Sequence, residues 1–276
     1  MIQIFAINKK YAAAVAPNKP VGLKTLRFPG GEMHVTVDAG RAADELVIRA
    51  HLPNSDAVMT LLMVTDALRR TYPGVPVALD MPYVPYARQD RAANPGEALS
   101  AKVFCNLINA QGYARVVVQD PHSDVVTALL DRVVVDDPLP ALRRIVESLP
   151  DTPALVAPDA GARKRVQKLA SALELEVVFA DKVRDTRTGE ITGTQVIGDL
   201  PARPLLVVDD ICDGGRTFIE LAAALRDKQD TQALSKPLFL YVTHGIFSKG
   251  LDPLLADYTA VFTRNNWTDD GRCQVV

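Results

Sequence analysis

The sequence has few cysteines, almost no excess charge and no long hydrophobic run. Its three cysteines, Cys105, Cys212 and Cys273, are far apart and form no CxxC pair, which argues against a zinc site or a disulfide framework. The 31 basic and 33 acidic residues leave a net charge of −2, whereas a general nucleic-acid binder usually carries a basic excess. No apolar run approaches the roughly 18 residues that span a membrane.

The N-terminal segment 1–10 has its apolar residues before its lysines, which is the reverse of a secretory signal. We therefore expect a cytoplasmic protein with neither nucleic acid nor membrane as a partner. The 276 residues, 48% of them hydrophobic, are enough for about two domains. A chain of this size can fold without the help of a metal or a disulfide.

Short β-branched runs alternate with amphipathic helical segments along the whole chain. Runs such as 116–118 and 205–208 are continuously apolar, which is typical of parallel strands buried on both faces. The alternation predicts an α/β fold in which mostly parallel sheets are flanked by helices on both faces. Strands are expected at 2–7, 45–50, 75–81, 115–119, 132–135, 154–157, 176–180, 205–208, 237–242 and 260–263.

Helices are expected between these strands. The cluster Asn54, Ser55 and Asp56 is typical of an N-cap and predicts a helix that reaches residue 71. Further helices are expected at 100–110, 138–148, 160–173 and 217–228.

Acidic residues and prolines interrupt the pattern at 136–140, which predicts two domains, 1–138 and 139–276. Two segments, 83–99 and 181–193, are too long and polar for ordinary connections. Loops of that length are often functional.

The segment at 205–218 is the strongest functional signal. A buried strand ends in Asp209 and Asp210, a short turn containing Gly214 and Gly215 follows, and a helix begins at Thr217. Glycines let the backbone approach an anion closely, and the free amides at a helix start favour phosphate. The paired acids suit ribose hydroxyls or a nearby metal. The structural alternative is a tight strand–helix turn with an acidic N-cap.

This segment resembles the phosphoribosyl-pyrophosphate (PRPP) loop that type I phosphoribosyltransferases share with PRPP synthetases. The rest of the chain favours the second group, because further segments resemble PRPP synthetase motifs in the family's order. They lie at 82–91, 100–102, 120–122, 158–161 and 243–247. The sequence is thus similar to ribose-phosphate pyrophosphokinases over nearly its whole length. The resemblance implies two phosphoribosyltransferase-like domains, the first on the ATP side and the second with the ribose-phosphate loop.

The activity implied by the resemblance is Mg²⁺-dependent transfer of a pyrophosphoryl group from ATP to the 1-hydroxyl of ribose 5-phosphate, which gives PRPP and AMP. ATP is then the co-substrate and Mg²⁺ the cofactor. Cationic side chains and Mg²⁺ would stabilise the charge that builds up on bridging oxygens. The resemblance also implies a homodimer or a higher homo-oligomer, because the loop that contains Phe28 would meet adenine bound to a neighbouring subunit.

The resemblance implies a role for each of a set of polar residues. The ATP-binding residues would be Phe28, Glu32, Arg88, Gln89 and Asp90, and the ribose-phosphate-binding residues would be Asp209, Asp210, Asp213, Gly214, Gly215, Arg216 and Thr217. The metal ligands would be His122 and Asp159, and the catalytic residues Lys182, Arg184 and His122.

Structural alternatives stay open for several of these residues. Arg88 can be a solvated loop arginine, 28–32 a β-turn between two strands, and His122 a structural histidine. Lys182 and Arg184 can belong to a solvated charged loop. In an extended segment, however, residues i and i+2 share a side, so both cations would face one target.

The sequence departs from the family at several positions. Gly30 stands where the family usually has an acidic or amide residue, Gly214 where it usually has Thr, and Arg216 where it usually has Gly. Residues 185–193 are unlike the family's common loop, and the chain stops short of the family's usual last helix.

These departures leave alternatives open. The acceptor could be a 5-substituted ribose such as ADP-ribose, whose extra negative charge Arg216 would meet. A catalytically silent regulatory relative is disfavoured because the catalytic cations, His122 and the paired acids are all present. A simple phosphoribosyltransferase is disfavoured by the ATP-side half of the chain.

Overall fold

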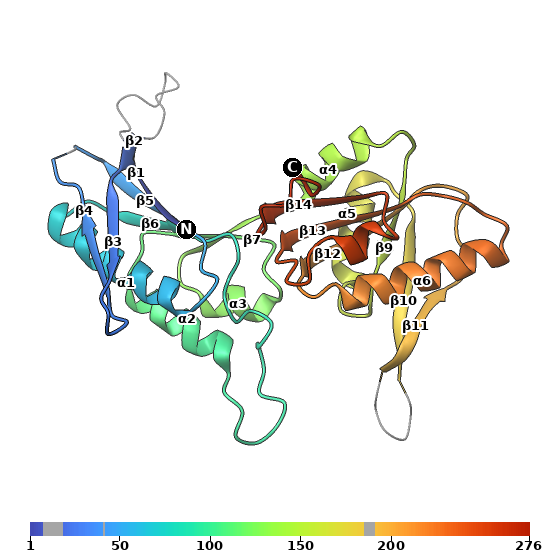
Figure 1. The fold of residues 1–276 in the computed structure, drawn as a ribbon, viewed down its shortest axis with the longest axis horizontal. Helices are drawn as coiled ribbons and strands as arrows, with labels where there is room; N and C mark the ends of the chain where they lie inside the picture. Colours follow the sequence, from blue (N-terminus) through green and yellow to red (C-terminus); the bar gives the residue numbers. More distant parts are fainter. Residues whose placement is uncertain (8–18, 41, 185–190) are drawn as a thin grey trace. The chain divides into compact units, whose positions relative to one another are not determined.

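The computed structural model describes residues 1–7, 19–40, 42–184 and 191–276 (Figure 1). The chain divides into two compact units, Met1–Asp136 and Asp137–Val276, called unit 1 and unit 2 below. Each unit has a mostly parallel sheet with helices packed on it, so the predicted α/β class is confirmed. Within the described ranges, no helix is long and apolar enough to cross a membrane.

Unit 1 contains a six-stranded sheet with the order β2-β1-β5-β6-β7-β8. Its first strand pairs antiparallel with both of its neighbours, and the pairs from β5 to β8 are parallel. The strands are β1 (Ile2–Ile7), β2 (Lys19–Val21), β5 (Glu45–Ala50), β6 (Val77–Asp80), β7 (Val116–Gln119) and β8 (Val133–Asp136). A separate antiparallel hairpin is formed by β3 (Leu23–Arg27) and β4 (Met33–Val37).

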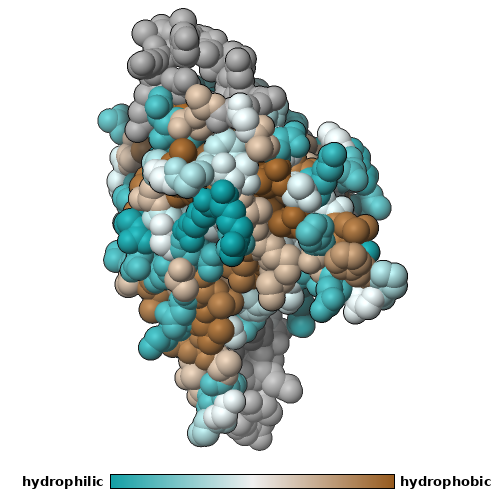
Figure 2. Space-filling view, turned by 90° about the vertical axis from the view of Figure 1, so that its left-hand side faces the viewer, coloured by the Kyte–Doolittle hydropathy of each residue, from teal (hydrophilic) through white to brown (hydrophobic). Residues whose placement is uncertain are grey.

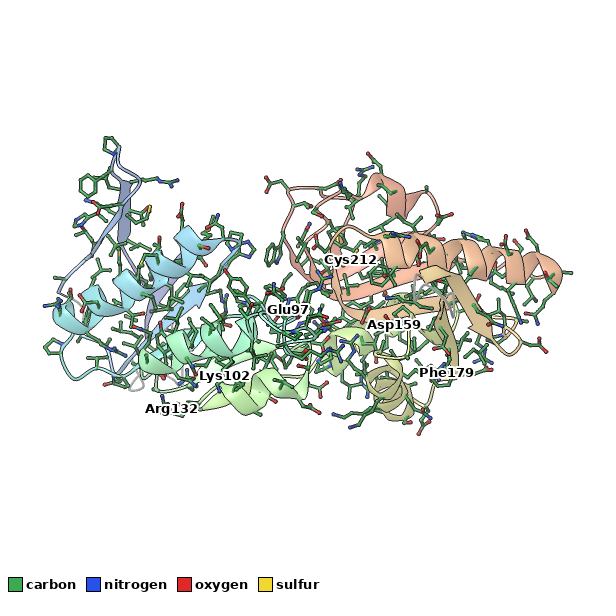
Figure 3. All side chains as sticks on the ribbon, turned by 90° about the horizontal axis from the view of Figure 1, so that it is seen from below. Glu97, Lys102, Arg132, Asp159, Phe179 and Cys212 are labelled. Carbon is green, nitrogen blue, oxygen red and sulfur yellow. The ribbon has the colours of Figure 1, made fainter. Side chains whose placement is uncertain are left out.

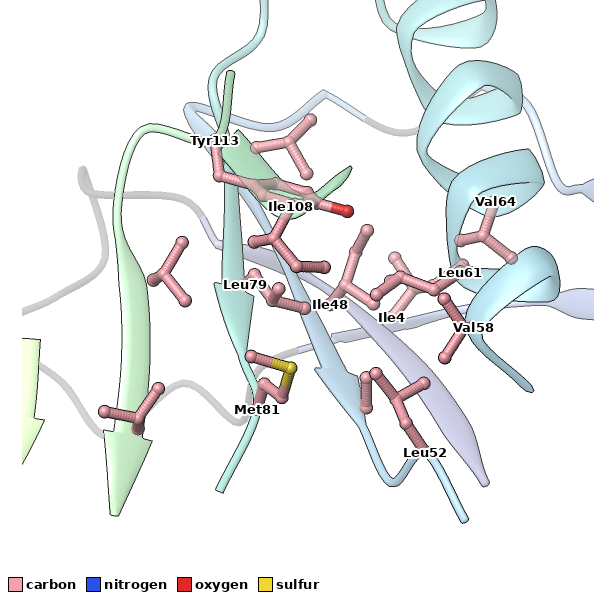
Figure 4. Close-up of a cluster of buried hydrophobic side chains, with 14 of the residues drawn as sticks. Ile4, Ile48, Leu52, Val58, Leu61, Val64, Leu79, Met81, Ile108 and Tyr113 are labelled. Atoms are coloured by element: carbon pink, nitrogen blue, oxygen red, sulfur yellow. The ribbon is translucent and has the colours of Figure 1, made fainter. Parts of the chain in front are cut away.

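Three helices are described in unit 1: α1 (Ser55–Thr71), α2 (Ser100–Ala110) and α3 (Asp124–Leu129). Their apolar side chains join those of the strands in one buried cluster, in which Leu61 of α1 lies near Ile4 and Ile48 (Figure 4). The alternation predicts helices on both faces, but in the described part of unit 1 all three cover the same face. The sequence of β5 gives a reason for the uncovered face. Arg49 is exposed between two buried residues and pairs with Asp80 of β6 at 2.8 Å, so the second face of the sheet carries charged side chains.

Unit 2 contains a seven-stranded sheet with the order β11-β10-β9-β12-β13-β14-β15. The pair of β10 and β11 is antiparallel, and the other pairings between its described strands are parallel. The strands are β9 (Ala154–Ala157), β10 (Val177–Arg184), β11 (Ile191–Ile197), β12 (Leu205–Cys212), β13 (Leu238–Gly245), β14 (Ala260–Asn266) and β15 (Gln274–Val275).

The unit 2 sheet is covered on both faces. Leu205 and Val207 pack in one cluster with α6 (Arg216–Thr231) and α7 (Asp252–Leu255). Leu206 and Val208 pack in the other cluster with α4 (Leu139–Ser148) and α5 (Arg163–Leu173). The apolar run of β12 is therefore buried on both faces, as its sequence predicts.

Several predicted elements match closely. The helix capped by Asn54 is confirmed, because the Oδ1 atom of Asn54 accepts a hydrogen bond from the backbone N of Ala57 at 2.9 Å. The segment 83–99 contains neither helix nor strand, as expected.

The expectation of a loop over 181–193 is wrong at both of its ends. Residues up to Arg184 continue β10, and β11 begins at Ile191, so the two ends pair as an antiparallel ribbon. Residues 185–190 lie outside the described residues. Backbone pairing with β11 keeps β10 extended even though its last residues are polar, which a search for apolar runs does not detect.

The core of unit 1 gives a test of packing with a matched control on one helix. Leu61 is fully buried and Met59, two residues earlier, is 50% exposed. We expect Leu61→Ala to lower the free energy of unfolding by about 2–5 kcal/mol, because it leaves a cavity. Met59→Ala should change it by about 0.5 kcal/mol or less. Chemical denaturation of the two variants measures both values, and equal losses would contradict the packing described.

Candidate active site

The polar residues of unit 2 gather at the carboxyl edge of its sheet. Strands β9, β10, β12 and β13 are parallel, so they end at the same edge. Asp159 follows β9 and Cys212 ends β12 (Figure 3). Lys182 lies near the end of β10. Ligands of open α/β sheets bind outside the carboxyl ends of the strands. This edge is therefore the candidate site.

A glycine turn connects β12 to α6 at this edge. Gly215 is the N-cap of α6 and has φ 77°, a left-handed conformation that glycine adopts without strain. Its carbonyl accepts hydrogen bonds from the backbone N of Phe218 and Ile219, both at 3.0 Å. The amides of Arg216 and Thr217 lie in the first helical turn and have no acceptor within the helix. Such a helix start can bind a phosphate group.

The loop after β13 supports this turn. The backbone N of Ile246 donates to the carbonyl of Cys212 at 2.9 Å, and that of Ser248 donates to the carbonyl of Asp213 at 3.1 Å. These bonds place Lys249 beside Gly214, since its Cγ lies 3.8 Å from the position of a Cβ on that glycine. Exposed Lys249 has no ion-pair partner within the described part of the chain.

Arg216 is the first residue of α6, where a positive charge is unfavourable to the helix. Its side chain is 82% exposed and pairs with Glu220 one turn later at 2.6 Å. The hydrogen bond that Arg216 donates to Glu220, together with the Coulomb attraction between the two groups, raises the pKa of Arg216. The structure thus gives the arginine a partner within its own helix.

Asp209 and Asp210, called the acid pair below, both contact Arg165 of α5. Arg165 forms a close ion pair with the Oδ1 atom of Asp209, and its Nη1 atom lies 3.3 Å from Oδ1 of Asp210. Asp210 is only 6% exposed. Burial raises the pKa of Asp209, and the charge of Arg165 opposes that shift. One arginine faces two carboxyl groups, so the site can accept further positive charge or hydrogen-bond donors.

Lys182 is held on β10 by the residue that follows β9. Its Nζ atom lies 3.0 Å from the Oδ2 atom of Asp159. The Oδ1 atom of Asp159 accepts hydrogen bonds from the backbone N of Gly161 at 3.0 Å and of Ala162 at 3.2 Å. Lys182 lies on a strand and not in a loop, and the side chain of Arg184 lies outside the described residues.

A second contact holds β10 from the start of α5, just after this turn. Arg163 pairs with Asp181 at 2.6 Å, and its guanidinium carbon lies 5.4 Å from the centre of the Phe179 ring. Asp181 and Lys182 are consecutive residues of a strand, so their side chains leave it on opposite faces. The turn after β9 and the start of α5 therefore contact β10 through both of them.

In unit 1, Arg88 and Gln89 are exposed and Asp90 is half-buried, all in the connection between β6 and α2. The carbonyl of Gln89 accepts a hydrogen bond from the backbone N of Ala101 at 3.2 Å, which ties the connection to the start of α2. Tyr86 has φ 63°, a conformation that costs energy in a residue other than glycine. Backbone strain of this kind concentrates at functional sites.

His122 is exposed and follows β7. Asp120, two residues earlier, is 6% exposed and has φ 39°, a second strained backbone position in unit 1. The backbone N of Asp120 donates to the carbonyl of Asp136 at 3.3 Å, at the end of the neighbouring strand β8.

Phe28 and Glu32 lie at the tip of the β3–β4 hairpin. The backbone N of Phe28 donates to the carbonyl of Glu32, and that of Gly31 to the carbonyl of Phe28, both at 2.8 Å. This is the β-turn between two strands that the sequence left open. Phe28 is 45% exposed, so its ring is accessible at the tip.

The described side chains fit a divalent cation that arrives with its substrate. They contain no group of three or more His, Cys, Asp and Glu residues that could hold a metal alone. Mg²⁺ is commonly bound by one or two carboxylates and by substrate phosphates. Asp159 and the acid pair supply carboxylate oxygens at the candidate site.

The structure brings Asp159 and Lys182 together in unit 2, and it places the acid pair and the glycine turn at the same edge. The sequence did not single out Arg163, Arg165 or Lys249. A signal for the first two was available, because residues 163–165 are all basic and lie at a helix start, where positive charge is unfavourable. Basic residues at a helix start are therefore expected to form ion pairs with acidic residues elsewhere in the chain.

Two family models match this chain. One is described as the N-terminal domain of ribose phosphate pyrophosphokinase and matches residues 5–112, and the other is the phosphoribosyl transferase domain and matches residues 139–230. A ribose-phosphate pyrophosphokinase of Agrobacterium fabrum is 35% identical over 88% of this chain and 79% of its own length. One of Granulibacter bethesdensis is 36% identical over 87% and 77%.

A solved structure, the phosphoribosylpyrophosphate synthetase from Mycobacterium smegmatis, has a similar fold. The TM-score is 0.79, the sequence identity is 24%, and the match covers 93% of this chain and 86% of that one. The prediction of two phosphoribosyltransferase-like domains is thereby confirmed.

The glycine turn gives a test in which the two glycines serve as a matched pair. Gly215 has a positive φ and Gly214 does not, and a Cβ on Gly214 would meet only ordinary contacts. We expect Gly215→Ala to lower the free energy of unfolding by about 1–2 kcal/mol, the cost of the left-handed conformation. Gly214→Ala should have little effect. Thermal denaturation compares the variants, and a reversed order would contradict this geometry.

Proposed function

Because this chain belongs to the ribose-phosphate pyrophosphokinase family, we propose that it transfers the pyrophosphoryl group of ATP to the 1-hydroxyl of ribose 5-phosphate. The products are PRPP and AMP. The observation that carries the proposal is the presence of the glycine turn, the acid pair and Lys182 at one sheet edge in unit 2. AMP release from ATP in the presence of ribose 5-phosphate tests it.

The two ends of the acceptor need different partners: the 5-phosphate needs hydrogen-bond donors, and the ribose hydroxyls need hydrogen-bond acceptors. The amides at the start of α6, after Gly215, hold the 5-phosphate. The acid pair accepts hydrogen bonds from the ribose 2- and 3-hydroxyls, because carboxylates are strong acceptors. The 1-hydroxyl is then positioned for attack on the β-phosphorus of ATP, and the bond from that phosphorus to the oxygen of AMP breaks.

Lys182 and Arg184 act on the transferred group. Negative charge spreads over the phosphoryl oxygens as the bond to AMP breaks, and fixed cations stabilise it. The ion pair with Asp159 keeps the ammonium group of Lys182 at the sheet edge. It also keeps the group close to where the phosphates are proposed to bind.

ATP is proposed to bind through Arg88, Gln89 and Asp90 of unit 1, with Phe28 and Glu32 supplied by a neighbouring copy. The exposure of Arg88 and Gln89 supports the proposal, since an accessible guanidinium can stack on a purine or pair with phosphates. Unit 1 also exposes large hydrophobic side chains, and its surface shows hydrophobic patches between hydrophilic ones (Figure 2). Patches of this kind favour association into a homo-oligomer.

Mg²⁺ is the proposed cofactor, and each unit has a residue proposed as a metal ligand, His122 in unit 1 and Asp159 in unit 2. When bound, it would offset the negative charge of the phosphates. Asp159 offers an oxygen ligand of the kind that Mg²⁺ prefers, and exposed His122 is accessible to a metal or a phosphate.

We expect Lys182→Ala and Arg184→Ala each to lower kcat by about 10²–10³-fold, because each removes one charge-stabilising donor. The melting temperature should stay close to that of the wild type. Lys168→Ala, at an exposed position of α5, is the control and should keep full activity. Steady-state assays of AMP release provide the measurement. A loss of kcat under about threefold in both variants would rule out the catalytic role, because one charge-stabilising donor contributes far more than that.

A second candidate is the same transfer to a 5-substituted ribose such as ADP-ribose. The observation that favours it is extra positive charge at the glycine turn. Exposed Lys249 lies beside Gly214, and the exposed side chain of Arg216 begins α6. A 5-diphosphate would bring additional negative charge to this end of the acceptor site.

Arg216→Gly separates the two acceptors. With ribose 5-phosphate the variant should keep most of its activity. With an acceptor carrying a 5-diphosphate it loses a charge-assisted contact worth roughly 1.5–3 kcal/mol, or about 10- to 150-fold in kcat/KM. Assays with ribose 5-phosphate and ADP-ribose follow AMP formation. Glu220→Gln is the control for the ion pair within the helix. Wild-type turnover of ribose 5-phosphate alone eliminates the second candidate, and turnover of ADP-ribose alone eliminates the first.

A further inference from the structure

The turn after β9 and the first residues of α5 together contact the strands on both sides of β9. Asp159 and Arg163 pair with consecutive residues of β10, as described above. Arg165 reaches the opposite neighbour, β12, and contacts both members of the acid pair. Arg165 is thus the connection between this segment and the carboxylates proposed to bind the acceptor.

We propose that Arg165 is a positioning residue that fixes the acid pair in the geometry that binds the ribose hydroxyls of the acceptor. This inference rests on the proposed function. It assigns Arg165 no contact with the reacting atoms.

The backbone of Arg165 is anchored by its neighbours. It is the third residue of α5, and Val166, the next residue, is fully buried in the cluster beneath the sheet. Only 23% of the Arg165 side chain is exposed. Because the helix is packed and the side chain is largely buried, the guanidinium of Arg165 has little freedom to move and can hold the carboxyl groups that it contacts in place.

The contacts also determine how each carboxyl group is oriented. Oδ1 of Asp209 receives both the Arg165 ion pair and a hydrogen bond from the backbone N of Asp210 at 2.9 Å. Two partners on one oxygen restrict rotation of the carboxyl group. A second nitrogen of Arg165 contacts Asp210. The planar fork of arginine can hold two carboxylates at once, which the single ammonium of lysine does less well.

The charges explain why the arginine is needed. Two adjacent carboxylates repel one another, and partial burial strengthens the repulsion. Arg165 brings a positive charge to both carboxyl groups and weakens this repulsion. Without it, the carboxylates would turn apart and lose the orientation in which we propose that they accept hydrogen bonds from the ribose hydroxyls.

The alternative is that Arg165 only joins α5 to β12. A purely structural role would lower stability and leave acceptor affinity unchanged. Positioning predicts a specific loss of acceptor binding that does not extend to ATP.

The experiment compares Arg165→Gln and Arg165→Lys with Lys164→Gln, an exposed position one residue earlier on the same helix. Acceptor binding is measured by calorimetry with ribose 5-phosphate and with ADP-ribose. The KM values of the acceptor and of ATP are measured by AMP release. Arg165→Gln should weaken acceptor binding and raise the acceptor KM by about 10- to 150-fold, the range for a lost charge-assisted contact. The ATP KM should stay within about twofold.

Arg165→Lys should recover part of the affinity, and Lys164→Gln should match the wild type. If Arg165→Gln fails to fold, Arg165→Lys alone must still show a raised acceptor KM. Unchanged acceptor affinity in both Arg165 variants would overturn the inference, as would equal losses for acceptor and ATP. A wild-type protein that binds neither acceptor would overturn the proposed function, and this inference with it.

Discussion

The ion pairs of residues 159–165, which form the turn after β9 and the start of α5, determine how the candidate site is built. This segment lies in the middle of three strands, because β9 pairs with β10 on one side and with β12 on the other. Through Asp159 and Arg163 it contacts the strand that carries Lys182. Through Arg165 it contacts the strand that carries the acid pair. The positions of a cation and of two acids therefore depend on one short connection.

The site also separates charge along a short stretch of chain. The acid pair lies just before the glycine turn, and the positive end of the α6 dipole lies just after it. A molecule with hydroxyls at one end and phosphate at the other matches this order. The match depends on backbone geometry, since the left-handed conformation of Gly215 is what brings the helix start so close to the end of the strand.

Local signals were enough to predict the elements that contain this site. The bounds of β1, β5, β9 and α2 are those expected, because each is one apolar run or one amphipathic stretch. The end of β10 was not predicted, because its polar residues stay extended through pairing with β11. Arg165 was not predicted for a related reason. Its partner Asp209 is 44 residues away, and no local pattern connects a helix start to a distant strand end.

The structure points to Lys249, rather than Arg216, as the cation that would distinguish ribose 5-phosphate from a larger anionic acceptor. Arg216 suggested a larger anionic acceptor, because a cation at a helix start calls for an anion. Glu220 now supplies that anion within the same helix, so the arginine is explained without a ligand. Lys249 has no such explanation, because it is exposed, forms no ion pair with the described residues and lies beside Gly214, which has no side chain. A phosphate extending beyond the turn would therefore meet Lys249, and the acceptor question depends more on this residue than on Arg216.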